Sequence, residues 1–223
     1  MEIQIIGADA AFDGLNTSLF FKDNLGRGVL VDCGATVYYE LARRNMRDDI
    51  DVVLVSHEHG DHTGSLAIYG AYSRIVRQKK LIVGGIDVSE LFRVQGILPD
   101  DFIPLAADDS LNVQAIPTKH IEAHGNNHAL FIADSILYTG DCNENMLTTE
   151  YAKQAKIIFH DATLSERAAY AHATLATLST APAEIKAKTW LIHLPVHEHD
   201  EAVRLAAEHG FAGVCYNGQE LEV

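Results

Sequence analysis

Residues 57–62 concentrate groups that can bind a metal ion or transfer a proton. The segment reads His57-Glu58-His59-Gly60-Asp61-His62. A helix or a strand cannot present so many ligands on one face, whereas a turn can, and Gly60 tolerates the unusual backbone angles of a turn. Imidazoles together with a carboxylate suit Zn²⁺, with Mn²⁺ or Fe²⁺ as alternatives. The density of ligands favours a metal site over a solvated polar loop.

Further metal-capable residues directly follow apolar runs that we predict to be strands. They are Asp32 after residues 29–31, His57 after 52–56, Asp141 after 137–140, His160 and Asp161 after 157–159, and His193 after 190–192. Side chains at strand ends open onto the same edge of the sheets, where a rigid scaffold can position them together. We therefore expect these residues to converge in one cleft.

Two of the remote histidines have competitors nearby. His120 is preferred because it follows the strand predicted at 112–117 most closely, and His193 because it ends a strand directly. The alternatives that stay open are His124 and His128 for the first position, and His197 and His199 for the second.

The elements that must position these residues are mostly strands. Apolar and alternating runs predict strands at 2–7, 18–22, 29–32, 51–56, 80–83, 112–117, 129–133, 135–139, 156–160, 189–194 and 214–217. Helices are predicted at 36–47, 64–74, 88–95, 165–180 and 200–208. A glycine just past the last of these helices is a typical stop signal. Because the helices fall between groups of strands, the pattern predicts two mixed sheets with helices outside them, not a doubly wound parallel sheet.

Length and composition predict one globular domain. The chain has 223 residues, of which 48% are hydrophobic and 22% charged, so a single domain over 1–223, made of two half-domains, is expected. No apolar run approaches the roughly 20 residues of a membrane span. The first residues have no basic region and no cleavage site, and the three cysteines are widely spaced. We therefore expect a cytoplasmic protein without a secretion signal or a disulfide framework.

The charge balance bears on the partners of the protein. Asp and Glu number 31 against 17 Lys and Arg, which gives a formal net charge of −14. Binding to a phosphate backbone depends on clustered Lys and Arg, so a large nucleic acid is a disfavoured partner. A small phosphorylated or ester substrate remains compatible with this charge.

The order of the motifs resembles the metallo-β-lactamase superfamily. Residues 57–62 match its signature, His-x-His-x-Asp-His after an apolar strand. The other elements follow in the superfamily's order along essentially the whole chain, namely Asp32, His120, Tyr138-Thr139-Gly140-Asp141 and His193. The resemblance implies the α+β architecture of that superfamily, a four-layer αβ/βα sandwich.

The resemblance also implies two divalent metal ions per chain, with Zn²⁺ as the expected metal. Matched by position, His57, His59 and His120 hold one ion, Asp61, His62 and His193 hold the other, and Asp141 bridges both. A water between two cations loses its proton near neutral pH, so the bridging hydroxide is the expected nucleophile, oriented by Asp61. Asp32 is expected to support the metal loop from the second layer of contacts.

Two late segments resemble the branch of the superfamily that contains tRNA 3′-processing endonucleases (tRNase Z) and small phosphodiesterases. Residues 159–163 resemble its His-Glu-Ala-Thr stretch, and residues 171–174 resemble its His-Ser-Thr motif. The resemblance implies that His172 is the general acid at the leaving oxygen and that Asp161 orients it. Asp161 stands where the branch more often has Glu, so a shorter arm must reach the same partner. The alternative is that His172 is an exposed residue on an alanine-rich helix.

The short architecture favours a small substrate. His120 and Asp141 are 21 residues apart, which leaves no room for the long basic arm of tRNase Z. We therefore expect a phosphodiesterase acting on a cyclic nucleotide or cyclic phosphate, and a homodimer, as is common in this branch. Residues 119–123 differ from the Gly-His-Thr-x-Gly run of many acyl hydrolases. The alternatives are a tRNase Z-like ribonuclease, a lactonase or thioesterase, and a non-catalytic binding protein.

Overall fold

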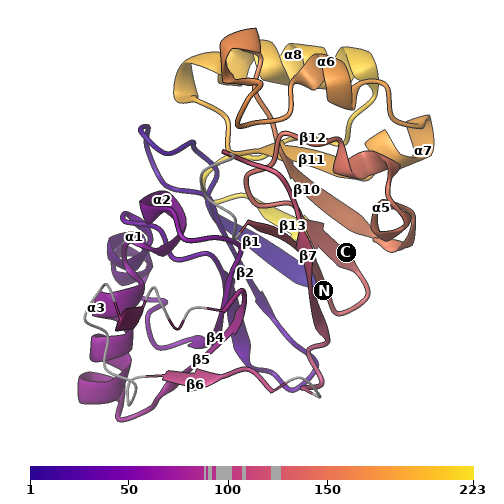
Figure 1. The fold of residues 1–223 in the computed structure, drawn as a ribbon. Helices are drawn as coiled ribbons and strands as arrows, with labels where there is room; N and C mark the ends of the chain where they lie inside the picture. Colours follow the sequence, from indigo (N-terminus) through magenta and orange to yellow (C-terminus); the bar gives the residue numbers. More distant parts are fainter. Residues whose placement is uncertain (88, 90–91, 94–101, 107–108, 122–126) are drawn as a thin grey trace.

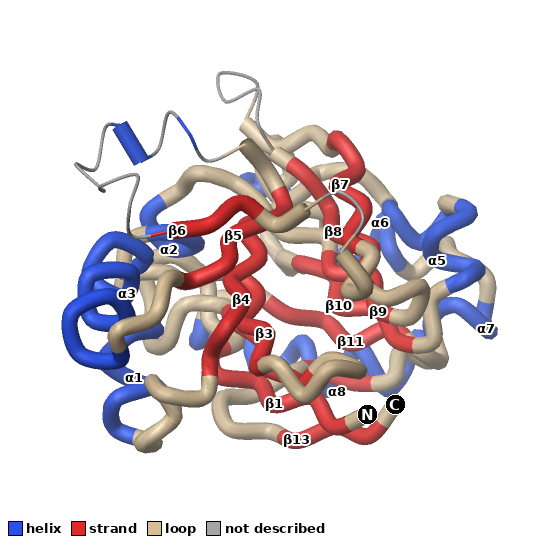
Figure 2. Tube along the Cα trace, turned by 90° about the horizontal axis from the view of Figure 1, so that it is seen from below, coloured by secondary structure: helices blue, strands red, loops and turns tan. Residues whose placement is uncertain are grey.

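Two β-sheets pack face to face, and helices cover the outer face of each sheet (Figure 1). The computed structural model describes residues 1–223 except 88, 90–91, 94–101, 107–108 and 122–126. Seen from below, the helices lie on opposite sides of the stacked strands (Figure 2). The predicted four-layer α+β sandwich with two mixed sheets is therefore confirmed.

The first sheet comes mainly from the N-terminal half of the chain. Its strands are β1 (Glu2–Gly7), β2 (Ser18–Lys22), β3 (Gly28–Val31), β4 (Ile50–Val55), β5 (Leu81–Gly85), β6 (Phe102–Pro104) and β13 (Glu220–Glu222). Their order is β13-β1-β2-β3-β4-β5-β6, with parallel pairing from β3 to β6 and antiparallel pairing elsewhere. The central β4 is almost wholly apolar and buried along its length, as a parallel strand covered on both faces must be.

The second sheet comes from the C-terminal half. Its strands are β7 (Val113–Pro117), β8 (His128–Ile132), β9 (Ile136–Tyr138), β10 (Ile157–Asp161), β11 (Thr189–Ile192) and β12 (Gly213–Val214). Their order is β12-β11-β10-β9-β8-β7. The strands from β9 to β12 are parallel, so their carboxyl ends meet at one edge of the sheet.

The helices divide between the two outer layers (Figure 1). Those on the first sheet are α1 (Val37–Arg43), α2 (Gly60–Thr63) and α3 (Leu66–Tyr72), and α3 continues into a π-helical segment, Ser73–Arg77. Those on the second sheet are α5 (Glu150–Gln154), α6 (Leu175–Leu178), α7 (Ala183–Lys186) and α8 (His199–His209). Helix α8 ends at Gly210, whose φ of 77° lies in the left-handed region that glycine adopts without strain. The predicted stop signal is confirmed.

Three clusters of buried apolar side chains hold the four layers together. One lies between the two sheets and joins β1, represented by Ile5, to β10, represented by Phe159. A second joins the first sheet to α1 and α3. The third joins the second sheet to α5, α6, α7 and α8. Each interface removes apolar surface from water, and this is the main favourable contribution to folding.

Some predicted elements differ from the structure. The single helix predicted at 165–180 is wrong: a 3₁₀ turn at Glu166–Ala168 and helix α6 are separated by an irregular segment. In that segment the carbonyl of Ala173 accepts a hydrogen bond from the Thr163 amide, and α6 starts only at Leu175, after Thr174, whose hydroxyl caps it. Strands β6 and β13 and helices α5 and α7 were not predicted, because short segments carry little periodicity. The helix predicted at 88–95 lies partly outside the described residues.

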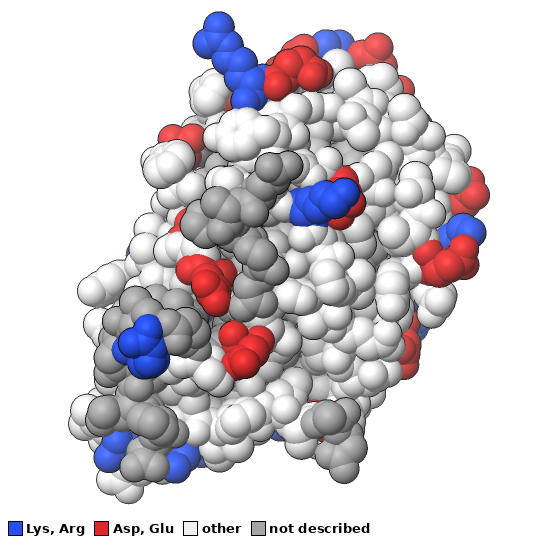
Figure 3. All heavy atoms as spheres, in the orientation of Figure 1, with Lys and Arg blue, Asp and Glu red and all other residues white. Residues whose placement is uncertain are grey.

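On the face of the molecule seen in Figure 3, the described residues carry scattered charged side chains. On the face seen in Figure 3, the Lys and Arg side chains of the described residues stand apart and form no band. No helix among the described residues has the length and apolar character needed to cross a bilayer.

Candidate metal centre

The candidate site lies where strand ends of both sheets meet. Asp32 directly follows β3 and His57 comes just after β4 in the first sheet. Asp141 comes after β9, Asp161 is the last residue of β10, and His193 directly follows β11 in the second sheet. The structure thus places these residues at one junction between the sheets, where rigid strands position side chains that project from loops. The expectation is wrong for His160, which does not line the cleft and whose Nε2 accepts a hydrogen bond from the Met146 amide.

The histidine-rich segment changes from non-helical backbone at residues 57–59 to a short helix that begins at Gly60. His59 is extended and Gly60 begins α2, so Asp61 and His62 project from the first turn of a helix. Gly60 does not have the positive φ expected from the sequence. The change from extended to helical backbone at His59 is enough to bring side chains from both sides of it to one point.

Two groups of ligands share one carboxylate. His57, His59, His120 and Asp141 place ligand atoms within 4.8 Å of one another, and so do Asp61, His62, His193 and Asp141. Asp141 lies between the groups. Its Oδ1 is 3.2 Å from His62 Nε2, and its Oδ2 is 3.3 Å from His193 Nε2 and 3.7 Å from His120 Nε2. The two groups contain the same residues as the two ligand sets that the superfamily resemblance implied, and their binding of metal stays a prediction.

Each of four imidazoles is held through its Nδ1 atom, which leaves Nε2 facing the ligand group. His62 Nδ1 lies 2.6 Å from Asp32 Oδ2, and His120 Nδ1 donates to the Ala171 carbonyl at 2.7 Å. His57 Nδ1 is 3.1 Å from Ser56 Oγ, and His193 Nδ1 is 3.0 Å from Thr17 Oγ1. Such bonds to the second ring nitrogen fix the tautomer and orientation of metal-binding histidines.

Asp32 supports this arrangement without belonging to either ligand group. It is fully buried, and its carboxylate accepts hydrogen bonds from the amide and hydroxyl of Ser56. The same carboxylate accepts a 2.7 Å bond from the Tyr138 hydroxyl and holds the His62 ring. The structure therefore gives Asp32 the supporting position that we expected from the sequence.

The buried polar atoms of the site fit metal ions. Several buried polar atoms of the site have no hydrogen-bond partner. They include His57 Nε2, Asp61 Oδ2, His62 Nε2 and Asp141 Oδ1. A buried polar atom without a partner is unfavourable by about 1–3 kcal/mol, so several such atoms in one place need a common explanation. Imidazole nitrogens and carboxylate oxygens are ligands for divalent ions of the zinc type. The donor set therefore fits two divalent ions, one in each ligand group.

Electrostatics in the metal-free site also point to cations. Burial lowers the pKa of His57 well below its ordinary value and lowers that of His193, so both rings are neutral, as ligands must be. Burial opposes protonation of His62, but the Asp141 and Asp32 carboxylates raise its pKa well above the ordinary value. A metal ion at this position must therefore displace a proton from His62, and metal binding must depend on pH.

His172 lies in the same cleft and is paired with Asp161. Its Nδ1 is 2.8 Å from Asp161 Oδ2. Burial lowers the pKa of His172, but the hydrogen bond to Asp161 outweighs it and brings the pKa to about 9. The shorter Asp arm thus reaches its partner, and the Asp161 amide is fixed by the Thr139 hydroxyl. The alternative that His172 is an exposed residue on an alanine-rich helix is wrong, because it stands in the irregular segment before α6.

The competing histidines are separate from the two ligand groups or cannot be placed. His199 Nε2 lies 3.5 Å from the carboxylate of Asp9, and His197 lies in a 3₁₀ turn, Val196–Glu198. His128 is the first residue of β8, whereas His124 lies outside the described residues. Among the described residues, the ligand groups contain His120 and His193 at the two disputed positions.

Apart from Asp32, sequence reasoning missed the side chains that hold the ligands. Tyr138 stands inside the motif at 138–141, and its place next to the strand end could have indicated a supporting role. Ser56 directly precedes the histidine-rich segment and offers a similar local signal. Thr17 offers none, because it is 176 residues away from His193 in the chain.

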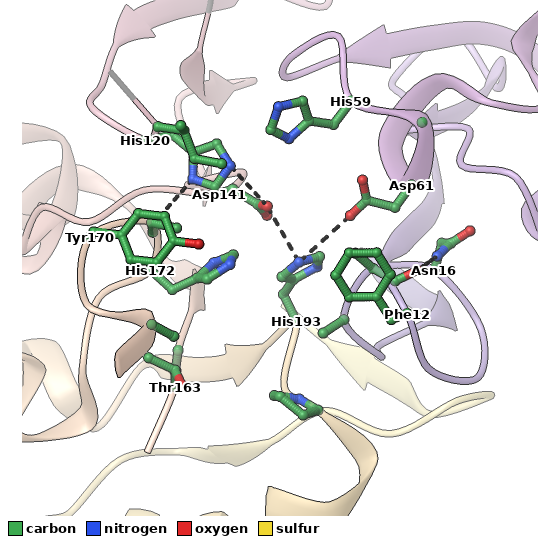
Figure 4. Close-up of a pocket in the computed structure, with 18 of the residues that line it drawn as sticks. Phe12, Asn16, His59, Asp61, His120, Asp141, Thr163, Tyr170, His172 and His193 are labelled. Atoms are coloured by element: carbon green, nitrogen blue, oxygen red, sulfur yellow. Dashed lines mark hydrogen bonds and ion pairs between the residues drawn. The ribbon is translucent and has the colours of Figure 1, made fainter. Parts of the chain in front are cut away.

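The ligand groups open into a cleft of about 610 Å³. Figure 4 shows His172, His193 and Asp141 at its centre, with Tyr170 and Phe12 on opposite sides. No Lys or Arg is among the described residues that line it. Among the described residues that line the cleft, His172 is the side chain whose pKa is raised, to about 9, so that it carries a positive charge at neutral pH.

Comparisons with known proteins agree with this architecture. The metallo-β-lactamase fold protein YhfI from Bacillus subtilis superposes with a TM-score of 0.77 at 19% identity, covering 100% of this chain and 99% of YhfI. A diphosphatase of the PhnP family superposes with a TM-score of 0.74 at 18% identity, covering 100% of this chain and 97% of that one. These likenesses confirm the metallo-β-lactamase fold.

Sequence comparison identifies the family. Anti-Pycsar protein Apyc1 of Paenibacillus harenae is 28% identical over 221 residues, covering 86% of this chain and 89% of that protein. The model of the family described as Anti-Pycsar protein Apyc1 matches residues 1–84 and 84–221. The match extends over nearly the whole sequence. The chain therefore belongs to the Anti-Pycsar protein Apyc1 family.

Proposed function

We propose that this chain hydrolyses a phosphodiester bond in a small substrate such as a cyclic nucleotide or a cyclic phosphate. The observation that carries the proposal is the pair of His172 and Asp161, whose imidazole lines the same cleft as the two ligand groups. Divalent ions bound there, for which we propose Zn²⁺, would supply charge for the phosphoryl oxygens and make an attacking water more acidic.

His172, Asp161 and Asp61 have separate roles in this hydrolysis. His172 carries a proton at neutral pH, and Asp161 occupies its Nδ1, so Nε2 is the nitrogen that protonates the leaving oxygen. Asp61 lines the cleft, and its Oδ2 is a buried atom without a hydrogen-bond partner. This oxygen can bind a cation or orient the attacking water. Hydrolysis of an ester with a weakly basic leaving group has less need of an acid at this position.

Several features support a small substrate. A cleft of about 610 Å³ is of the size that binds small molecules. The described lining residues include no Lys or Arg, and the net charge of −14 disfavours a long polyanion. The family to which the chain belongs is described as Anti-Pycsar protein Apyc1. We propose that this chain has the anti-Pycsar activity that the family's name gives.

Turnover assays on the metal-loaded protein test the proposal. The substrates are a 3′,5′-cyclic nucleotide, a 2′,3′-cyclic nucleotide, bis-p-nitrophenyl phosphate, a p-nitrophenyl ester and a lactone. We expect hydrolysis of the phosphodiesters and little of the last two. Preference for the ester or the lactone would support an acyl hydrolase instead, and no turnover on any of them would support a binding protein. Light scattering on the same sample tests the proposed homodimer.

The variant His172→Ala separates acid catalysis from a structural role. It should retain its metal and lose about 10²–10⁴-fold in rate on a cyclic nucleotide, whose alkoxide leaves poorly without a proton. It should lose far less on bis-p-nitrophenyl phosphate, because nitrophenolate leaves readily. His209→Ala is the matched control, since His209 is exposed at the end of α8. Equal losses on both substrates would contradict the acid role.

A further inference from the structure

Two exposed aromatic side chains stand at the cleft on opposite sides of the ligand groups (Figure 4). Phe12 is fully exposed and Tyr170 is 67% exposed, yet both line the cleft. An exposed aromatic ring gains nothing from burial on folding, so the fold does not account for either ring. Scattered exposed apolar residues are common. Two rings that flank one ligand-lined cleft are a more specific arrangement.

The loop that carries Phe12 is held rigidly. Asp9 anchors its base: the Asp9 amide donates to the Leu15 carbonyl at 3.0 Å, and its carboxylate accepts from the Leu15 amide at 2.8 Å. At the tip, the Asp13 amide donates to the Ala10 carbonyl at 3.2 Å. The Asp13 carboxylate also accepts from the Val196 amide, just beyond β11. These bonds hold the backbone that carries the ring before any ligand binds, which reduces the entropy lost on binding.

Tyr170 is tied to the metal centre on the other side. Its carbonyl accepts a 2.8 Å hydrogen bond from Asn143 Nδ2, which also donates to the carbonyl of His120 at 3.2 Å. One amide group therefore connects the Tyr170 segment to a candidate metal ligand. Two residues further along is His172, the proposed acid.

Apart from the ligand groups, His172 and the two rings, the described residues that line the cleft are mostly small or apolar. They include Ala10, Ala11, Ile121 and Pro195, with Asn16 and Thr163 as the polar side chains. A wall of this composition binds the flat face of a ring better than it binds a sugar or a peptide. Stacking of an aromatic side chain on a nucleobase contributes to binding whichever base is present.

We propose that Phe12 and Tyr170 form the subsite for the planar base of the substrate, while the ligand groups and His172 take the phosphodiester. This inference rests on the proposed phosphodiesterase function and specifies its substrate as one that carries an aromatic ring. The rings act in binding and touch neither the reacting phosphorus nor the leaving oxygen.

Kinetics of single variants test the subsite. Phe12→Ala and Tyr170→Ala should each raise KM for a 3′,5′-cyclic nucleotide about 5- to 100-fold with little change in kcat. Phe12→Tyr keeps a ring and should stay near the wild type, whereas Phe12→Leu should resemble Phe12→Ala. A ribose 3′,5′-cyclic phosphate with a methoxy group in place of the base should respond to none of these changes. Tyr216→Ala is the matched control, since Tyr216 is 60% exposed and does not line the cleft.

A binding measurement distinguishes failure of the subsite from failure of the proposed function. Saturation-transfer NMR with adenosine, which has a base but no phosphate, should show contact with the wild type and a weaker effect with either alanine variant. Contact with adenosine, without turnover of any phosphodiester, would support the subsite and contradict the proposed function. Unchanged KM values together with equal adenosine signals in wild type and variants would overturn the subsite.

Discussion

Removing the charge of Asp161 should change the proton affinity of His172. The substitution Asp161→Asn keeps the size of the side chain and removes its negative charge. In the wild type the carboxylate is 2.8 Å from His172 Nδ1 and raises the pKa of His172 to about 9, against the opposing effect of burial. Without the charge, burial remains, so the pKa should fall to its ordinary value of 6.5 or lower.

The size of the effect follows from these two values. A fall from about 9 to 6.5 corresponds to roughly 3.4 kcal/mol of lost preference for the imidazolium. At pH 8 the protonated fraction of His172 would drop from about nine-tenths to about 3%, so a step that needs this proton should slow roughly 30-fold. At pH 6 most of the imidazole is protonated in both proteins, and the difference should shrink to about twofold or less. Bound cations lower the pKa of His172 in the wild type and in Asp161→Asn alike. The difference in rate between the two proteins then appears at lower pH and keeps its size.

Two measurements check this reasoning. The dependence of kcat on pH, with a 3′,5′-cyclic nucleotide as substrate, should show an alkaline limb that moves to lower pH in Asp161→Asn. NMR titration of the His172 ring in the metal-free protein should show the same displacement directly. An equal loss of rate at pH 6 and pH 8, or an unchanged titration, would refute the account of the pair. Bis-p-nitrophenyl phosphate serves as the control substrate and should show little difference.

Three further changes test the metal site and the fold. Wild-type protein should bind close to two divalent ions per chain by elemental analysis, and Asp141→Ala should weaken both and abolish turnover, because it removes the shared ligand. Asp32→Ala should weaken metal binding about 10–100-fold in a competition assay with a chelator, because it frees an imidazole whose orientation it holds. Hydrogen bonds from Arg43 and Arg44 lower the pKa of Glu40 from 4.5 to about 2. Glu40 therefore stabilises the fold fully above pH 4.5, and this contribution is lost as the pH falls through about 2. Glu40→Gln should lower the free energy of unfolding by about 1–2 kcal/mol at pH 7, and by progressively less below pH 4, in urea titrations; the full shift is not expected because Arg43 is mostly exposed.

The fold and the set of candidate ligands were accessible from sequence because their signals are local. The histidine-rich segment places ligand types within six residues, and the other candidates stand at the ends of apolar strands. A strand end is visible in the sequence, and parallel strands bring their ends to one edge without any further information. These two patterns indicated two mixed sheets and a cleft at their strand ends, whereas the four-layer arrangement and the division of the ligands between two ions came from the resemblance to the metallo-β-lactamase superfamily.

The surroundings of His172 show where local reasoning fails. The alanines of residues 165–180 favour a helix by intrinsic propensity. In the structure the carbonyl of Ala171 accepts from His120, and that of Ala173 accepts from Thr163. Contacts with distant strand ends thus take the hydrogen bonds that a continuous helix would have used, and they turn His172 into the cleft.

The sequence by itself therefore determined which residues can bind metal and which strands carry them, whereas the tertiary structure alone decided what holds them in place and what surrounds the substrate. Thr17 meets His193 across 176 residues of chain. Phe12 and Tyr170 come to one cleft from the two halves of the protein. No local sequence pattern predicts such pairs. They form only when the apolar faces of the two sheets pack together and bring the edges of both sheets to the same place.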